Sequence, residues 1–286
     1  MKTGKTIVGV CFLITTKCNL RCNICYANLN SVENSSQKVY LEIIAKIAAF
    51  GAKKITFTGG EPLLVKHIET LLAKAKELDL KVALTTNANL MNLEKLKRLE
   101  CYIDEISVPM DGYSNDVLSV HRTIKHDHEN VRNIIRYARY FDVKVDVSTV
   151  LTRHNSHEVE YLLDMLQENN IYKWKIFQYS KLNKPKGESI DFNISKYHYQ
   201  KILKRIKKKI NSLNYTVQVD SRSNSIAAIN SYVTVLPDGT LMLTKDNSYI
   251  NIGNILCCHN DGELTDTLVK NGFSFTEHYR RHYRDI

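Results

Sequence analysis

Two hydrophobic patterns alternate along the chain, one typical of strands and one typical of helices. Short runs rich in Val, Ile, Thr and aromatic residues predict six strands, at residues 7–14, 54–58, 81–86, 105–108, 143–151 and 173–179. Between them, apolar residues recur every three or four positions and predict helices at residues 40–50, 66–78, 92–100, 129–140 and 156–169. The alternation predicts an α/β fold in which helices cover a parallel sheet.

The number of strands and a later change of rhythm set the expected domain organisation. Six strands are fewer than the eight of a closed barrel, so we expect an open, partial (β/α)6 TIM-like barrel. After about residue 180 come a long basic helix, a polar stretch at 220–225 and a hairpin with its turn at Pro237-Asp238-Gly239. We therefore predict a core at residues 1–180 and a C-terminal α+β extension at residues 181–286, which closes the barrel and contributes to the substrate site.

The chain carries a positive net charge of +10, from 40 Lys and Arg against 30 Asp and Glu. This balance suits phosphate-bearing partners such as nucleotides, nucleic acid or anionic lipid, and charge alone does not choose among them. The densest basic run, residues 201–209, has apolar residues at helical spacing. Its pattern favours a solvated helix face over a nucleic-acid surface, so we expect no nucleic-acid partner.

Cysteine usage and hydropathy indicate the compartment. Seven cysteines, three of them within eight residues, make a disulfide framework improbable and favour the reducing cytoplasm. The apolar run at residues 7–16 follows two lysines as a signal peptide would, but β-branched residues dominate it and no small-residue cleavage site follows. No run reaches the length of a membrane span, so we expect no membrane partner.

Three cysteines follow the first predicted strand at C-x-x-x-C-x-x-C spacing: Cys18, Cys22 and Cys25. Thiolates are the ligands of iron–sulfur clusters, and three of them leave one iron of a four-iron cluster open to a substrate. The alternatives are structural cysteines or a zinc site. Structural zinc takes four ligands with paired spacing, and the neighbouring sequence offers no natural fourth ligand.

A second motif, Gly59-Gly60-Glu61-Pro62, follows the second predicted strand. Two glycines allow the backbone to approach a ligand closely, and Glu61 with free carbonyl groups can accept hydrogen bonds from an ammonium group. Alone, the motif would be explained by a strand-to-helix turn. The carboxyl ends of adjacent parallel strands share one edge of the sheet, so we expect this motif and the three cysteines to form one site.

Together the two motifs resemble the radical S-adenosylmethionine (SAM) superfamily, and the resemblance spans roughly residues 6–180. It implies a [4Fe-4S] cluster on the three cysteines, with SAM bound to the open iron. It also implies an electron donor such as flavodoxin or ferredoxin. One electron would cleave SAM to methionine and a 5′-deoxyadenosyl radical, which abstracts a substrate hydrogen.

The same resemblance assigns SAM-binding residues. It implies that the Gly-Gly-Glu-Pro motif binds the methionine amino group and that Tyr26 lies beside the adenine. Asn87 and Ser107 follow or end the third and fourth predicted strands, and the resemblance places them at the ribose or the carboxylate of SAM. Without it, a capping role for Asn87 and a core role for Ser107 would be the default.

A narrower resemblance, to the viperin-like nucleotide dehydratases, appears later in the chain. Residues 172–178 (Tyr-Lys-Trp-Lys-Ile-Phe-Gln) are similar to a Trp-Lys-x-Phe-Gln strand of that family, and residues 152–155 resemble its Asn-Arg-Phe-Asn turn. The resemblance implies a lyase that converts a nucleotide to its 3′-deoxy-3′,4′-didehydro product, with a role in antiviral defence. It implies substrate contacts by four cations and a catalytic tyrosine near the ribose: Arg122, Arg153, Lys173, Lys175 and Tyr232.

The sequence differs from the viperin-like family at two places that bear on the substrate, and one other enzyme class remains an alternative. Asp146 stands where the family has a lysine for the triphosphate, and residues 108–111 (Val-Pro-Met-Asp) replace a Cys-Asp-Ser segment. The rival is a peptide-modifying radical SAM enzyme, because residues 236–239 and 252–255 also resemble its extension. Auxiliary clusters there need several further cysteines, whereas only Cys257 and Cys258 lie nearby; the same shortage disfavours a guanosine-triphosphate cyclase. A cluster-containing RNA-binding barrel remains the non-enzymatic alternative.

Overall fold

A computed structural model describes residues 5–27, 32–122, 128–169, 171–181, 190–213, 215–223, 230–245 and 248–282. Within these residues, ten strands form one sheet in the order β10-β9-β8-β1-β2-β3-β4-β5-β6-β7. The strands are β1 (Gly9–Thr15), β2 (Lys54–Gly59), β3 (Lys81–Thr85), β4 (Glu105–Pro109), β5 (Lys144–Leu151), β6 (Lys173–Gln178), β7 (Gln218–Arg222), β8 (Val233–Val235), β9 (Thr240–Lys245) and β10 (Ser248–Asn254). All six predicted strands are present.

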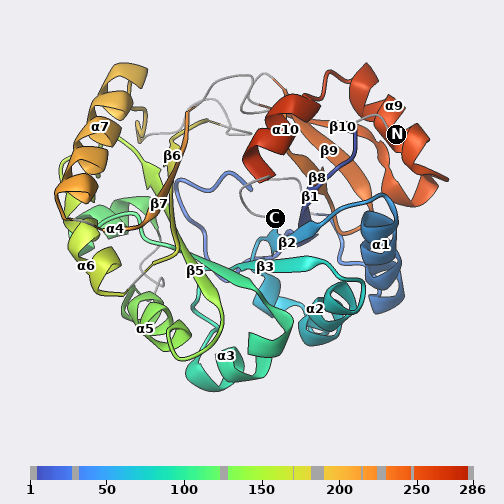
Figure 1. Cartoon of the computed structure of the whole chain (residues 1–286), viewed down its shortest axis with the longest axis horizontal. Coiled ribbons are helices and arrows are strands. Elements are labelled where there is room, and N and C mark those ends of the chain that lie inside the picture. Colours follow the sequence, from blue (N-terminus) through green and yellow to red (C-terminus); the bar gives the residue numbers. More distant parts are fainter. Residues whose placement is uncertain are drawn as a thin grey trace.

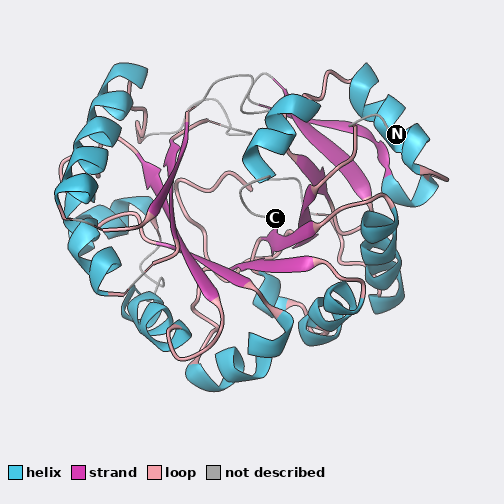
Figure 2. Cartoon of the chain, viewed as in Figure 1, coloured by secondary structure: helices cyan, strands magenta, loops and turns pink. Residues whose placement is uncertain are grey.

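Neighbouring strands from β8 to β7 are parallel, whereas β9 pairs antiparallel with β8 on one side and with β10 on the other. The sheet curves, and the crossover helices lie on its outer side (Figures 1 and 2). The helices are α1 (Gln37–Ala49), α2 (Ile68–Glu77), α3 (Leu93–Leu99), α4 (Asn115–His121), α5 (His128–Ala138), α6 (Leu162–Glu168), α7 (Lys196–Ser212), α9 (Asp261–Lys270) and α10 (Phe275–His282). The α/β partial barrel expected from the sequence is confirmed.

The main core lies between the sheet and its helices. Alternate residues of each strand, such as Val10, Phe12 and Ile14 of β1, join this core, and Phe12 packs against Phe57 of β2 with ring centroids 6.0 Å apart. Tyr40 of α1 donates a hydrogen bond to the Ile14 carbonyl at 2.7 Å and so fixes the helix to the strand. Burial of each large apolar side chain contributes about 1.5–3 kcal/mol.

The inner, concave side of the sheet is polar. Trp174 and Ile176 of β6 join the outer core, so Lys173 and Lys175, which alternate with them, face the interior. By the same alternation Asp146 of β5 faces inward, because Val145 and Val147 lie in the core. Charged side chains on the concave side cost desolvation energy, so stability alone does not explain them. A polar ligand can bind on this side of the sheet.

The extension adds β7 to one edge of the sheet and β8–β10 to the other. β7 and β10 are the two edges, so backbone pairing does not close the sheet among the described residues. Side chains meet across the gap instead: the Arg222 guanidinium of β7 lies 5.0 Å from the ring centroid of Tyr232, which precedes β8. Among the described residues, none of the helices combines the length and apolar composition needed to cross a bilayer.

Candidate functional site

The three cysteines of the first motif lie on the loop that follows β1, and none of the three is in a disulfide bond. The loop is tied to α4, because Asn23 N donates to the His121 carbonyl at 3.0 Å and Asn23 Nδ2 donates to the Val120 carbonyl at 2.9 Å. Arg122, which follows α4, directs its Nη1 at Cys22 Sγ, 3.6 Å away. A short helix that the sequence did not predict therefore positions the cysteine loop.

The donor set fits a four-iron cluster better than a single metal ion. Among the described residues, no three His, Cys, Asp or Glu side chains converge as one metal ion would require. In a four-iron cluster each thiolate binds its own iron, so the sulfurs surround a cube instead of meeting at a point. Burial raises the pKa of Cys18, a backbone hydrogen bond from Leu20 opposes the rise, and Glu61, Cys22 and Cys25 add to it.

The Gly-Gly motif at the end of β2 packs directly against the backbone that leads into the cysteine loop. Gly60 N donates to the Thr15 carbonyl at 2.7 Å, and Glu61 N donates to the Lys17 carbonyl at 2.9 Å. A Cβ on Gly60 would lie 2.1 Å from the Lys17 oxygen, and Gly59 has φ +140°. We expected these glycines to admit a ligand, but this contact between two chain segments already requires them.

Glu61 is fully buried, and groups of the chain occupy both of its carboxylate oxygens. Leu63 N donates to Oε1 at 3.0 Å, Thr86 Oγ1 to Oε1 at 2.8 Å and Asn87 N to Oε2 at 2.8 Å. Burial raises the pKa of the carboxyl group, and these hydrogen bonds oppose the rise. The side chain thus joins the loop after β3 to the short 3-10 helix η1 (Pro62–Leu64).

Of the other expected SAM-binding residues, Asn87 and Tyr26 lie at the cysteine loop, whereas Ser107 is buried in the sheet. Asn87 touches the cysteine loop: its Nδ2 donates to Asn19 Oδ1 at 2.8 Å and lies 3.7 Å from Cys18 Sγ. The Tyr26 side chain is 47% exposed, but burial around its hydroxyl, opposed by a hydrogen bond with Thr58, raises its pKa to about 12. Ser107 is buried on β4, where its hydroxyl meets that of Ser148 at 3.1 Å.

Charged pairs fill the concave side of the sheet. Lys175 Nζ lies 2.5 Å from Asp146 Oδ2, so the departure noted in the sequence faces inward and pairs with an expected substrate residue. Lys54 and Lys81 both contact Glu105, at 2.5 and 2.8 Å. Despite its burial, Asp220 has a lowered pKa because of Arg222, Lys175 and Lys173 nearby. The interior therefore gathers cations from β2, β3, β6 and β7.

The remaining expected substrate residues are dispersed. Arg122 forms an ion pair with buried Asp111 at 2.6 Å, and Arg153 is 60% exposed and pairs with Asp191 at 2.8 Å on the surface. Only Lys173 and Lys175 share the concave side with the charges that surround Tyr232.

Sequence reasoning missed three residues around this site: Asp111, Arg222 and Arg281. The guanidinium groups of Arg222 and Arg281 lie 5.0 and 4.9 Å from the centroid of the Tyr232 ring, and the Tyr232 hydroxyl accepts a hydrogen bond from Arg281 Nη1 at 2.9 Å. Asp111 belongs to residues 108–111, which were noted as a departure from the viperin-like family, and Arg222 belongs to the polar stretch at 220–225. Arg281 belongs to a terminal basic run that carries no positional signal of its own.

Comparison with known proteins gives three findings. Residues 12–166 match the family model described as the Radical SAM superfamily. The chain is 26% identical over 267 residues to an S-adenosylmethionine-dependent nucleotide dehydratase of Flammeovirga pacifica, covering 89% of each chain. It is 27% identical over 215 residues to a protein of the same name from Lacinutrix mariniflava, covering 69% of this chain and 44% of that one.

Among solved structures, SuiB of Streptococcus suis bound to S-adenosylmethionine superposes with a TM-score of 0.77 at 16% identity. The match covers 96% of this chain and 68% of SuiB. At this identity the likeness concerns the fold: the curved sheet and its helices recur in a protein that binds S-adenosylmethionine.

Proposed function

The chain belongs to the radical SAM superfamily, and from this premise we propose that it abstracts a hydrogen atom from the ribose of a nucleotide and dehydrates the sugar. Enzymes of this superfamily use a [4Fe-4S] cluster and SAM. We assign the cluster to Cys18, Cys22 and Cys25. When bound, the cluster supplies one electron that cleaves SAM, and a flavodoxin- or ferredoxin-type donor restores that electron.

The chain's own residues hold SAM in this proposal. Asn87 and Tyr26 border the cysteine loop, and Ser107 lies deeper, so they would contact successive parts of one extended molecule. The buried Glu61 carboxylate joins its own motif to the loop after β3, through hydrogen bonds from Leu63 N, Thr86 Oγ1 and Asn87 N. Backbone carbonyl groups of the motif can then accept hydrogen bonds from the methionine ammonium group. They are better suited to this role than the Glu61 carboxylate, whose oxygens already accept hydrogen bonds from the chain.

The observation that carries the nucleotide assignment is the pair of lysines that β6 directs into the concave side. Lys173 and Lys175 alternate with Trp174, whose burial in the outer core fixes the orientation of the strand. Charge-assisted contacts to phosphate contribute about 1.5–3 kcal/mol each and hold the ribose where the 5′-deoxyadenosyl carbon can reach its hydrogen. The similarity to nucleotide dehydratases over 89% of both chains supports this assignment.

Asp146 bears on how many phosphate groups the substrate carries. Its carboxylate lies 2.5 Å from Lys175 Nζ and already neutralises one of the two cations. A triphosphate would bring the most negative charge next to this buried carboxylate, whereas a shorter phosphate chain need not reach it. We therefore propose a nucleoside mono- or diphosphate as the substrate. Arg153 is exposed and paired with Asp191, so it would contact a substrate only at the surface.

Tyr232 is the proposed proton donor in the dehydration. Its oxygen accepts a hydrogen bond from Arg281 Nη1, which leaves its own O–H free to donate to a ribose hydroxyl. After a hydrogen atom leaves C4′, the 3′-hydroxyl departs with this proton as water. A second electron from the external donor then completes the C3′–C4′ double bond, so atoms and electrons balance.

The experiment compares SAM cleavage by the anaerobically reconstituted protein with a panel of nucleotides and peptides. Lys175→Ala should reduce nucleotide-stimulated cleavage by about tenfold or more, and variant protein that remains folded should keep the slow unstimulated cleavage, since in this proposal Lys175 contacts the substrate and not SAM. Asp146→Asn should increase the response to a triphosphate. Lys204→Ala, which removes an exposed lysine of α7, is the matched control and should change neither rate.

A peptide substrate is the second candidate, favoured by the fold shared with SuiB, which has also been crystallised with the precursor peptide SuiA. Cys257 is exposed, whereas Cys258 is buried with its thiol 3.6 Å from the Asn254 carbonyl, an arrangement poorly suited to an auxiliary cluster. If peptides stimulate SAM cleavage and no nucleotide does, the nucleotide proposal is wrong and this candidate replaces it.

A further inference from the structure

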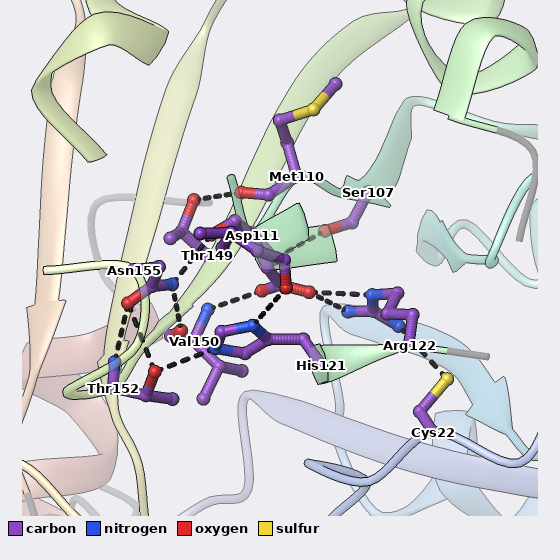
Figure 3. A network of polar contacts seen from close by, with 12 residues as sticks. Cys22, Ser107, Met110, Asp111, His121, Arg122, Thr149, Val150, Thr152 and Asn155 are labelled. Atoms are coloured by element: carbon purple, nitrogen blue, oxygen red, sulfur yellow. Dashed lines mark hydrogen bonds and ion pairs between the residues drawn. The ribbon is translucent and has the colours of Figure 1, made fainter. Parts of the chain in front are cut away.

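Arg122 lies between a buried carboxylate and one of the cysteine thiols. Its Nε donates to Asp111 Oδ2 at 2.6 Å, its Nη2 lies 2.6 Å from the same oxygen, and its Nη1 points at Cys22 Sγ at 3.6 Å (Figure 3). The Arg122 side chain is 14% exposed and that of Asp111 is fully buried. With its contacts divided between Asp111 and Cys22, the guanidinium is poorly placed to bind a substrate phosphate.

The position of Arg122 is fixed from both sides. Asp111 Oδ1 accepts a hydrogen bond from Val150 N at 2.8 Å, and the Asp111 carbonyl accepts one from Asn155 Nδ2 at 2.7 Å. On the other side, Arg122 N donates to the Leu118 carbonyl of α4 at 2.9 Å. The end of β5 and the end of α4 therefore hold the guanidinium in place, as the converging contacts in Figure 3 illustrate.

We propose that the Arg122–Asp111 pair sets the reduction potential of the iron–sulfur cluster through the Cys22 thiolate. The inference rests on the proposed ligation of the cluster by Cys22 and is independent of the nucleotide assignment. Net charge and hydrogen bonds to the sulfurs are two properties by which proteins adjust cluster potentials. Arg122 supplies both at one sulfur, and Asp111 supplies a compensating negative charge one contact further away.

The two residues act with opposite signs. Reduction adds one negative charge to the cluster, so the guanidinium stabilises the reduced form and its N–H lowers the electron density on sulfur. Asp111 weakens this stabilisation, because its carboxylate neutralises part of the guanidinium charge. The pair therefore holds the potential above that of a cluster without Arg122 and below that of a cluster beside an unpaired Arg122.

The test is an anaerobic redox titration of the cluster, followed by its electron paramagnetic resonance signal without SAM or substrate. Arg122→Gln should decrease the ratio of reduced to oxidised cluster about tenfold at a fixed applied potential, which is about 59 mV for a one-electron couple. Asp111→Asn should shift the midpoint upward, and Arg122→Lys should fall between Arg122→Gln and the unaltered protein. Arg153→Gln is the control, because Arg153 pairs with Asp191 on the surface, and its midpoint should not move.

Opposite shifts in the two variants support the inference, because damage to the fold would move both midpoints in one direction or remove iron from both. If Arg122→Gln and Asp111→Asn retain their iron and leave the midpoint unchanged, or shift it the same way, the inference is wrong. If Arg122→Gln does not assemble a cluster, Arg122→Lys and Asp111→Asn decide by the same criterion. Absence of a cluster from the unaltered protein would overturn both this inference and the proposed function, whereas a loaded cluster with unmoved potentials overturns this inference alone.

Discussion

Replacing Gly60 with alanine tests why the second motif contains glycine. The added Cβ would lie 2.1 Å from the Lys17 carbonyl oxygen and 2.5 Å from its carbon, so the backbone before Cys18 must recede by about 1.3 Å to reach an ordinary contact of 3.4 Å. That movement lengthens the 2.9 Å hydrogen bond between Glu61 N and the Lys17 carbonyl. Overpacking costs about 1–3 kcal/mol and a lost hydrogen bond about 0.5–1.5 kcal/mol.

Because the strain falls on the residue next to Cys18, Gly60→Ala should impair cluster assembly as well as SAM binding. Reconstituted variant protein should hold less than half the iron of the unaltered protein, measured by iron and sulfide analysis and by visible absorbance, with little change in helix content. Gly262→Ala is the control: it lies in α9, where alanine is a better helix former, and the nearest atom to its new Cβ is a side-chain oxygen of Asn260 at 3.0 Å.

The alternative explanation, that the glycine only makes room for a ligand, gives a different result. In that case Gly60→Ala would carry the full complement of iron and lose only the formation of 5′-deoxyadenosine. That outcome would refute the packing argument and restore the explanation drawn from the sequence.

Three further predictions concern the cysteines, the interior charges and the C-terminal helix. Single Cys18→Ala, Cys22→Ala and Cys25→Ala variants should lose the cluster, whereas Cys257→Ala and Cys258→Ala should retain all of it; half the iron lost from the last two would indicate a second cluster. Lys175→Ala removes the cation beside buried Asp146 and should lower the free energy of unfolding by about 3–5 kcal/mol in urea titrations, with partial recovery in Lys175→Ala/Asp146→Ala. Burial lowers the pKa of His278 from 6.5 to about 4, so its stabilising effect is complete above pH 6.5 and falls by about 3 kcal/mol as the pH drops to 4. His278→Gln should flatten that part of the stability profile, and an unchanged profile would mean that His278 is not responsible.

Local patterns sufficed for most of the barrel but not for its edges. The six predicted strands and five predicted helices correspond to β1–β6 and to α1, α2, α3, α5 and α6, because each repeats its hydrophobic period long enough to be read. Helix α4 was not predicted because its buried face combines Val117 and Leu118 with His121, so its apolar period is weak. The parallel pairing of Val10 with Val233 joins segments more than 200 residues apart, and no local pattern specifies it.

The candidate site shows the same limit. The cysteines and the Gly-Gly turn each follow a predicted strand, and the carboxyl ends of neighbouring parallel strands lie at one edge of the sheet. The sequence therefore predicted that the two motifs lie together. The partner of a charged side chain depends on which strands become neighbours. Asp146 and Lys175 lie on adjacent strands β5 and β6, and Asp111 meets Arg122 across α4, so neither ion pair could be inferred from sequence distance.

The transfer of deuterium from a nucleotide labelled at C4′ tests the proposed function most directly. Reconstituted protein would be incubated anaerobically with SAM, a reductant and each labelled nucleoside mono-, di- or triphosphate, and the 5′-deoxyadenosine would be analysed by mass spectrometry. We predict that 5′-deoxyadenosine acquires deuterium from a mono- or diphosphate, with equimolar loss of water from that nucleotide. Unlabelled 5′-deoxyadenosine with every nucleotide, from protein that holds its cluster and cleaves SAM, would contradict the account.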